Sequence, residues 1–254
     1  MSITSFPASR LREAAAISGV YDHINKTCLV IIDRSMWFAK SYEALADNNF
    51  QLLVRKHQRL AGQEDNFREP VIFAFNYAQR VFLCSAMELC LMHQHSNSVA
   101  LLAQLLPERM AQLKHLQALL KRRYKKYQIK SWGEWAALDR SVQLEHLREL
   151  SFANLEAAAT LFGDIYGSAC FDLAWGEDEH RQLAEQYGDY QTLRNGILHR
   201  GGEFSSGARI EATETDISTT FEDTKRFQDA ILRLSDWCRV WWIGQLAETP
   251  AKEQ

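Results

Sequence analysis

The sequence predicts an all-α protein folded as a helical bundle. Its 254 residues include only 4 prolines and 12 glycines, a low count of helix breakers for this length. Residues with a strong helical preference, such as leucine, alanine and glutamate, are frequent. Apolar residues also recur at spacings of three and four along most of the chain, which is the period of a helix with one buried face. The hydrophobic share of 46% and the charged share of 24% are typical of a globular protein.

The expected helices span residues 9–17, 21–60, 70–94, 98–127, 140–162, 178–199 and 216–246. Gly19 is expected to end the first helix, and the polar segment 62–66 marks a break after the second. The third helix is apolar nearly all round, so we expect it at the centre of the core. The chain should then form an N-terminal helical region over residues 1–66, added as a layer to a helical domain over residues 70–246, with a disordered tail over residues 247–254.

The helices of the C-terminal half follow from similar signals. Gly163 and Gly167 are expected to break the helix over residues 140–162, and the stretch up to Gly176 has no clear pattern. A glycine-containing loop and a short extended piece over residues 209–212 are expected before the closing helix. That last helix is the clearest prediction, because one face repeats apolar residues at spacings of four, three, four and three: Phe227, Ile231, Leu234, Cys238 and Trp241.

Composition narrows the classes of function. The net charge of −3 means that any nucleic-acid contact should be a local basic patch. The five cysteines are scattered and odd in number, so we expect reduced core residues in a cytoplasmic protein. Residues 1–19 lack the apolar run of a signal peptide. The most apolar stretch, 71–92, carries polar and charged residues, which favours a buried helix over a membrane span.

The chain also lacks the usual motifs for cofactors and metals. It contains no P-loop, no G-x-G-x-x-G and no H-E-x-x-H. His93 and His95 are two residues apart on a helix, so their rings should point in different directions. We therefore expect neither a cofactor nor a metal ion.

The segment Arg194-Asn195-Gly196-Ile197-Leu198-His199 places an arginine, an amide and a histidine within six residues, near the end of an expected helix. Arginine binds phosphate through a planar group that stays charged, and histidine transfers protons near neutral pH. In the absence of metal ligands, these groups suit the cleavage of RNA through its own 2′-hydroxyl. Arg194 and His199 lie about 140° apart on a straight helix, so two copies related by a two-fold axis would be needed to bring both to one cleft.

In this context the segment resembles the motif of the HEPN superfamily, an arginine commonly followed by Asn, Asp or His, and then a histidine after four to six residues. The apolar helix containing Glu88, the segment 151–154 leading to 161–163, and the long closing helix also resemble that all-helical domain. The resemblance covers residues 70–246. Residues 1–66 match nothing in it, and their role is left open.

The resemblance implies a metal-independent endoribonuclease that acts as a homodimer, in a toxin–antitoxin, anti-phage or CRISPR-associated setting with an antitoxin or defence-system protein as partner. Arg194 would stabilise the scissile phosphate, His199 would transfer a proton or orient the 2′-hydroxyl, and Asn195 would hold the site through hydrogen bonds. Some members of the superfamily have lost nuclease activity, so the second hypothesis is a catalytically silent subunit that binds nucleotide or a partner protein.

Each candidate also has a structural explanation. Arginine and histidine near a helix C-terminus are favoured by the helix dipole, which leaves a plain helical scaffold as the third hypothesis. Glu88 either faces the cleft and orients Arg194, or lies on a polar stripe facing solvent. A basic cluster either binds RNA backbone or simply ends a helix; it consists of Lys121, Arg122, Arg123, Lys125 and Lys126, and Arg200 is a further candidate RNA contact.

Overall fold

The computed structural model describes residues 8–47, 68–106, 154–200 and 214–248, together with residues 109, 113, 131, 134–135, 137–138, 150 and 152. These residues form the helices α1 (Ala8–Asp47), α3 (Arg68–Leu105), α8 (Leu155–Tyr166), α9 (Cys170–Trp175), α10 (Glu177–Arg200) and α11 (Glu214–Glu248). Within these ranges there is no β-strand. The predicted all-α fold is therefore confirmed.

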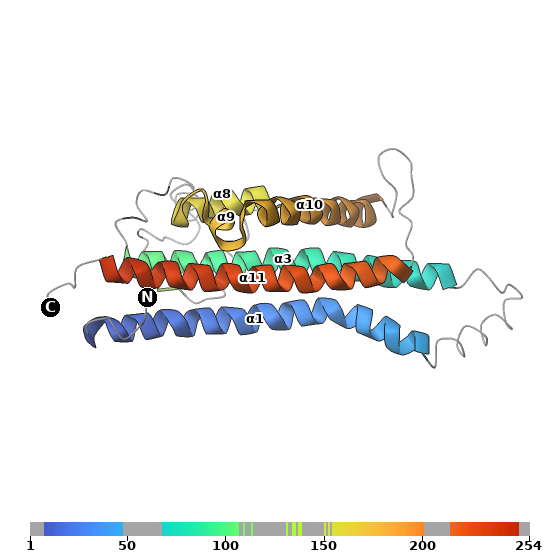
Figure 1. The fold of residues 1–254 in the computed structure, drawn as a ribbon, viewed down its shortest axis with the longest axis horizontal. Coiled ribbons are helices and arrows are strands. Elements are labelled where there is room, and N and C mark those ends of the chain that lie inside the picture. Colours follow the sequence, from blue (N-terminus) through green and yellow to red (C-terminus); the bar gives the residue numbers. More distant parts are fainter. Residues whose placement is uncertain are drawn as a thin grey trace, which may run out of the picture.

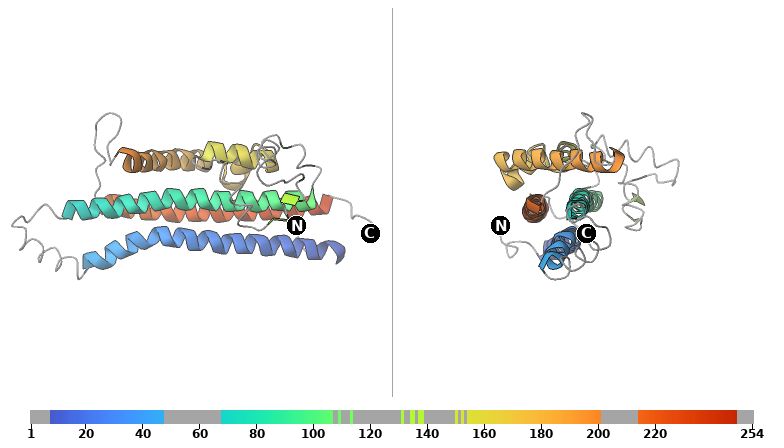
Figure 2. Two further views of the ribbon diagram at one scale, coloured as in Figure 1. Left: turned by 180° about the vertical axis from the view of Figure 1, so that it is seen from behind. Right: turned by 90° about the vertical axis from the view of Figure 1, so that its right-hand side faces the viewer.

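The three longest helices, α1, α3 and α11, lie side by side and pack on one another (Figure 1). A layer of α8, α9 and α10 covers α3 and α11 on the side opposite α1 (Figures 1 and 2). The right-hand view of Figure 2 shows that α10 lies across both α11 and α3. The central position predicted for the apolar third helix is borne out, because α3 contacts α1, α8, α10 and α11.

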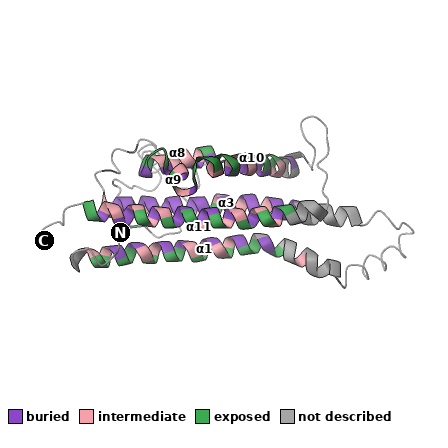
Figure 3. Ribbon diagram, viewed as in Figure 1, coloured by how far each residue is buried: buried purple, intermediate pink, exposed green. Residues whose placement is uncertain are grey.

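α1 is a single helix that continues through Gly19, so the predicted break there is wrong. Ile17 and Tyr21 flank the glycine and are both buried. A glycine inside a helix costs about 1 kcal/mol relative to alanine, whereas burying a large apolar side chain contributes about 1.5–3 kcal/mol. Packing on both sides therefore outweighs the local preference of the glycine. The buried row of α1 consists of Ala14, Ile17, Tyr21, Ile24, Cys28, Ile32 and Met36, and exposed residues follow its outer side (Figure 3).

α3 is also one helix where the sequence predicted two, with a boundary near residues 95–97. Two polar residues at this point donate hydrogen bonds to carbonyls of the same helix. Asn97 Nδ2 donates to the His93 carbonyl at 2.8 Å, and Ser98 Oγ donates to the Gln94 carbonyl at 2.8 Å. The Gln94 amide in turn donates to the Ile231 carbonyl of α11 at 2.9 Å. The polar run expected to break the helix is thus helical, and Gln94, Asn97 and Ser98 donate to backbone carbonyls.

α8 continues through Gly163, contrary to the predicted break, and ends at Gly167. A Cβ atom at Gly163 would lie 3.3 Å from the Ser168 Cα, so glycine permits a close backbone approach there. Gly167 has a φ of 101°, a conformation that favours glycine and terminates the helix. The start of α8 is set by Asn154, whose Oδ1 accepts a hydrogen bond from the Ala157 amide at 2.6 Å.

α11 has the buried face that its spacing predicts, since Phe227, Ile231, Leu234 and Cys238 are all fully buried. At the end of the row, Trp242 is buried and Trp241 is partly buried. The helix runs to Glu248, so residues 247 and 248 are helical, where a disordered tail was predicted. Residues 249–254, together with the extended piece predicted over 209–212, lie outside the described residues.

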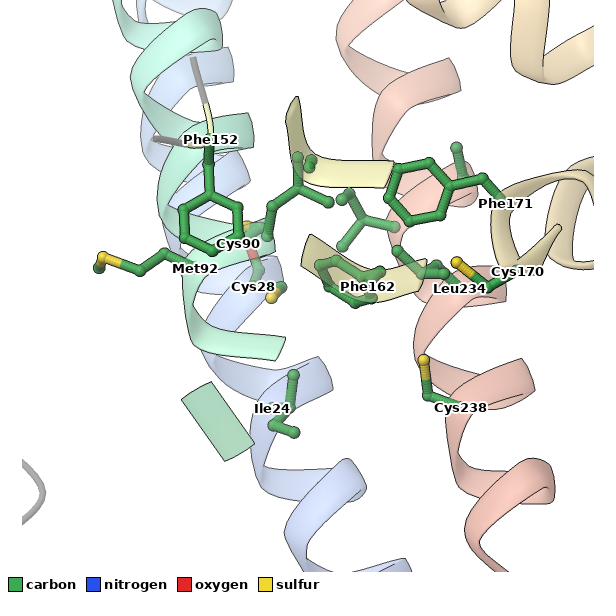
Figure 4. Close-up of a cluster of buried hydrophobic side chains, with 14 of the residues drawn as sticks. Ile24, Cys28, Cys90, Met92, Phe152, Phe162, Cys170, Phe171, Leu234 and Cys238 are labelled. Atoms are coloured by element: carbon green, nitrogen blue, oxygen red, sulfur yellow. Dashed lines mark hydrogen bonds between the residues drawn. The ribbon is translucent and has the colours of Figure 1, made fainter. Parts of the chain in front are cut away.

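One hydrophobic core joins these helices, and α1 contributes a row of buried residues to it alongside α3 and α11. Figure 4 shows its centre, where Phe162 of α8 points between α1 and α3 on one side and α11 on the other. The Phe162 and Phe171 rings are 5.3 Å apart between centroids. All five cysteines are buried and free, as their scattered positions suggested.

Candidate functional site

The motif segment occupies the last turns of α10, where that helix leaves α11 and passes over α3. Near its start, α10 is tied to α11 by an ion pair between Glu179 and Arg233. Further along, it reaches α3 through Arg194 and Glu88. Asn195, the next residue, is exposed, whereas Gly196 is buried. The arrangement presents Arg194 at an edge of the bundle instead of in its core.

Arg194 and Glu88 are brought together from positions 106 residues apart in the chain. Arg194 Nη1 lies 3.4 Å from Glu88 Oε2, which is longer than a strong charge-assisted hydrogen bond. The side chains are 25% and 35% exposed, so the pair is accessible to solvent and to a ligand. This is the contact expected if Glu88 orients Arg194.

A chain of hydrogen bonds behind Arg194 fixes its position. Gln191 Oε1 accepts from Arg194 Nη1 at 3.1 Å, and Gln191 Nε2 donates to the Tyr187 hydroxyl at 2.9 Å. The Tyr187 hydroxyl lies 3.3 Å from the Phe152 carbonyl and 3.5 Å from the Cys84 carbonyl, to which its single proton can be donated. Arg194 is therefore linked through two side chains to the backbone of the core.

The donors of Arg194 are only partly used. Nη1 serves both Glu88 and Gln191, whereas Nε is buried and has no hydrogen-bond acceptor among the described residues. A buried donor without an acceptor costs roughly 1–3 kcal/mol. Nη2 forms no hydrogen bond with the described residues, so the guanidinium retains capacity for a further acceptor at that nitrogen.

The nearest thiol is unsuited to act as a nucleophile. Burial raises the pKa of Cys84 to about 12, although the positive charge of Arg194 acts in the opposite direction. A thiol with so high a pKa stays protonated near neutral pH, and the thiolate is the reactive form. Burial likewise raises the pKa of Tyr187, so its hydroxyl remains a neutral hydrogen-bonding group. The chemistry of this site therefore rests on Arg194 and on the residues that follow it.

The structure places only some of the candidate residues. His199 and Arg200 belong to the last turn of α10, but their side chains lie outside what the structure describes. The basic cluster over residues 121–126 also lies outside the described residues. The distance from Arg194 to His199 and the position of the basic cluster consequently stay predictions.

Tyr187 and Gln191 were not predicted as residues of the site. Their signal was the spacing of four and three that joins Tyr187, Gln191 and Arg194 along one face of α10. The groups that Arg194 and Tyr187 contact outside α10 are Glu88 and the carbonyls of Cys84 and Phe152, which belong to other parts of the chain. No spacing within α10 indicates those partners.

Other features bear on the class of site. No group of three or more His, Cys, Asp or Glu side chains with a metal-binding arrangement occurs in the part of the chain that the structure describes. None of the described helices contains an apolar stretch suited to crossing a membrane. Fold and site thus define an all-helical protein with an arginine-centred polar site at the edge of its bundle. Compared with protein-family models, with characterised proteins and with solved structures, the chain matches none.

Proposed function

We propose that this protein is a metal-independent endoribonuclease of the HEPN type, with Arg194 and His199 as its catalytic residues. The observation that carries the proposal is the position of Arg194: its side chain is partly exposed at a bundle edge, hydrogen-bonded to Gln191 and paired with Glu88. Its Nη2 nitrogen forms no hydrogen bond with the described residues and suits an anionic ligand, because arginine matches the geometry of phosphate oxygens. The resemblance of the Arg194–His199 segment to the HEPN motif supplies the reaction type.

In the proposed reaction, the 2′-hydroxyl of the RNA attacks the adjacent phosphorus while the bond to the 5′-oxygen breaks. The products are a 2′,3′-cyclic phosphate and a free 5′-hydroxyl. Arg194 stabilises the charge that develops on the phosphate oxygens, and His199 takes or supplies the proton that moves. Asn195 is exposed beside Arg194 and contributes hydrogen bonds at the site. Glu88 is a positioning residue for Arg194.

The proposed site is composite. Arg194 and His199 point about 140° apart around a straight helix, so a second copy supplies the complementary group in each cleft. The substrate is single-stranded or loop RNA, because the 2′-hydroxyl must reach an in-line position. The cytoplasmic setting is a toxin–antitoxin or anti-phage system, with an antitoxin or another defence protein as the regulatory partner.

The test compares RNA cleavage by the wild type with that by Arg194→Ala and His199→Ala, in the presence of EDTA. We expect each substitution to reduce the rate by about 10²–10⁴-fold, because each removes a group that acts in the transition state. Loss of a residue that only complements the helix dipole would instead cost about 0.3–1 kcal/mol of stability. Thermal unfolding of each variant therefore accompanies the rate measurement.

Arg181→Ala is the matched control. Arg181 lies on the same helix, has a side chain that is 67% exposed and pairs only weakly, at 3.4 Å, with Asp178. Its replacement removes the same charge from α10 and should leave the cleavage rate unchanged. Cleavage by Arg194→Ala at the wild-type rate would refute the assignment, and cleavage that EDTA abolishes would refute the metal-free mechanism.

The second candidate function is a catalytically silent HEPN-like subunit that binds nucleotide or a partner protein. The pairing of Arg194 with Glu88 favours it, because an arginine held in an ion pair also serves to join α10 to α3. This alternative predicts that Arg194→Ala lowers the melting temperature or weakens partner binding, while no RNA is cleaved by the wild type in any setting.

A further inference from the structure

α1 and α3 together line an open groove of about 520 Å³ that lies outside the proposed active site. Val30 and Trp37 of α1 and Phe82 of α3 supply its apolar lining, and Asp33 and Arg34 supply its charges. The apolar side chains are well exposed, at 52% for Val30, 60% for Trp37 and 46% for Phe82. Exposing side chains of this size is unfavourable, so a cluster of them indicates a surface that another molecule covers.

The spacing of the exposed residues indicates the shape of that molecule. Val30 and Trp37 are seven residues apart on α1, and Phe82 is seven residues from Leu89, which is itself 40% exposed on α3. A spacing of seven repeats one position of a helix surface every two turns, and it forms the contact rows along which helices pack. The surface is therefore suited to long helices lying along α1 and α3.

The charges on this surface are arranged for a copy of the same chain. Asp33 and Arg34 are adjacent and exposed, and among the described residues neither takes part in an ion pair within its own chain. A two-fold interface brings a surface against itself, so an acid and a base on that surface can each pair with the opposite charge of the second copy. A surface for RNA would instead be basic. One acid beside one base is therefore compatible with pairing between two copies.

We propose that a second copy of this chain docks on the α1–α3 surface, with Asp33 of each copy facing Arg34 of the other. Glu88, which contacts Arg194, lies on the same stretch of α3 as Phe82 and Leu89, so a copy docked here lies near the Arg194 site. The inference names the pairing surface of the proposed enzyme, and only the connection between that surface and the Arg194 site rests on the proposed function. The pairing itself is measured without any RNA.

The experiment measures particle mass by light scattering and sedimentation over about 1–50 µM protein. The wild type should show twice the chain mass of 29.3 kDa. Asp33→Arg and Arg34→Asp each place like charges opposite one another in a symmetric pair, and each should weaken pairing by tenfold or more. Mixing the two variants restores opposite charges across the interface, so the mixture should regain the dimer mass.

Trp37→Glu tests the apolar contact, and Val240→Glu is its control. Val240 is 61% exposed on α11, so the control adds the same charge at an exposed apolar position on another helix. We expect a monomer for the first and a dimer for the second, each with a circular dichroism spectrum like that of the wild type.

A monomeric wild type over the whole concentration range would overturn the proposal, as would a mixture of the two charge variants that fails to pair. Loss of RNA binding by Trp37→Glu without a change in mass would identify the surface as a nucleic-acid site. A dimeric wild type that cleaves no RNA would leave the pairing standing and refute the proposed function alone.

Discussion

Arg194 shows how a single residue acquires a role from what surrounds it. On the sequence alone, an arginine near the end of a helix has an ordinary explanation in the helix dipole. In the structure its guanidinium contacts Glu88 and Gln191, and Gln191 is held by Tyr187. The position of the Arg194 guanidinium therefore depends, through Gln191, on the buried Tyr187 hydroxyl.

Replacing Tyr187 with phenylalanine tests that dependence. The substitution keeps the ring but leaves the Gln191 amide without its acceptor, so we expect a loss of about 1–3 kcal/mol of stability. For a chain of this size that corresponds to roughly 2–4 °C in melting temperature per kcal/mol. If Arg194 acts on RNA, the cleavage rate should also fall, because the guanidinium loses its support.

Tyr190→Phe provides the comparison for this prediction. Tyr190 lies on the same helix and donates to Asp223 at 2.5 Å, so it takes no part in the hydrogen bonds that support Arg194. Its replacement should lower stability and leave cleavage unchanged. Equal effects of the two substitutions on cleavage would show that Tyr187 acts through stability and not through Arg194.

At the scale of elements, the layer of short helices is joined to the long ones by polar contacts at its margin. Arg233 of α11 binds Glu179 of α10, and Arg226 Nη2 donates to Gln182 at 2.6 Å. The Trp175 indole of α9 donates to the Ala230 carbonyl at 2.7 Å, next to the buried face of α11. These contacts fix the N-terminal part of α10 against α11, and they therefore determine which part of α3 the C-terminal end of α10 contacts.

The Glu179–Arg233 pair predicts a pH-dependent stability. The hydrogen bond from Arg233 lowers the pKa of Glu179 below its ordinary value of 4.5, because it favours the charged carboxylate. The stabilisation is present above the ordinary pKa and is lost as the pH falls through the lowered one. We expect Glu179→Gln to melt below the wild type at pH 7, by about 0.2–1 kcal/mol for so exposed a pair, and to match it in acid.

The control repeats Glu179→Gln in an Arg233→Ala background. With the arginine absent, the glutamate has lost the main cause of its lowered pKa, so the substitution should have little effect at either pH. If the difference in stability between the wild type and Glu179→Gln stays constant from pH 7 into acid, the lowered pKa of Glu179 is contradicted.

At the scale of the whole molecule, a buried hydrogen-bond network joins four helices. The Tyr166 hydroxyl of α8 donates to Ser98 Oγ of α3 at 2.5 Å and accepts from the Trp242 indole of α11 at 3.1 Å. The Tyr21 hydroxyl of α1 lies 3.0 Å from it and serves as the second donor. Because α1 takes part in both this network and the core, it is an integral layer of the bundle.

Tyr166→Phe should destabilise the protein more than Tyr21→Phe does. It leaves two buried donors, on Tyr21 and Trp242, without their acceptor, each at a cost of about 1–3 kcal/mol. Removing Tyr21's hydroxyl leaves the other bonds of Tyr166 intact. Denaturant unfolding of both single variants and of the double variant gives the coupling between them, expected at about 0.5–3 kcal/mol. Strict additivity would mean that the network does not act as a unit.

The errors in the predicted helix boundaries share one physical cause. Gly19, the polar residues 95–97 and Gly163 are all local signals for a break, and in each case the helix continues. The neighbouring side chains are buried in the common core, and their burial outweighs the local preference. The buried face of α11 was predicted well because its apolar spacing and its packing agree.

The sequence by itself determined that the chain is helical, which face of α11 is buried, and that an arginine, an amide and a histidine share the end of one helix. These are local properties, because the helical period is set by 3.6 residues per turn. Only the tertiary structure decided that α1 belongs to the core, that α10 crosses both α11 and α3, and that Glu88 and Gln191 hold Arg194. The sequence of one helix face does not indicate which helix it packs against, because that pairing depends on how all the helices pack together.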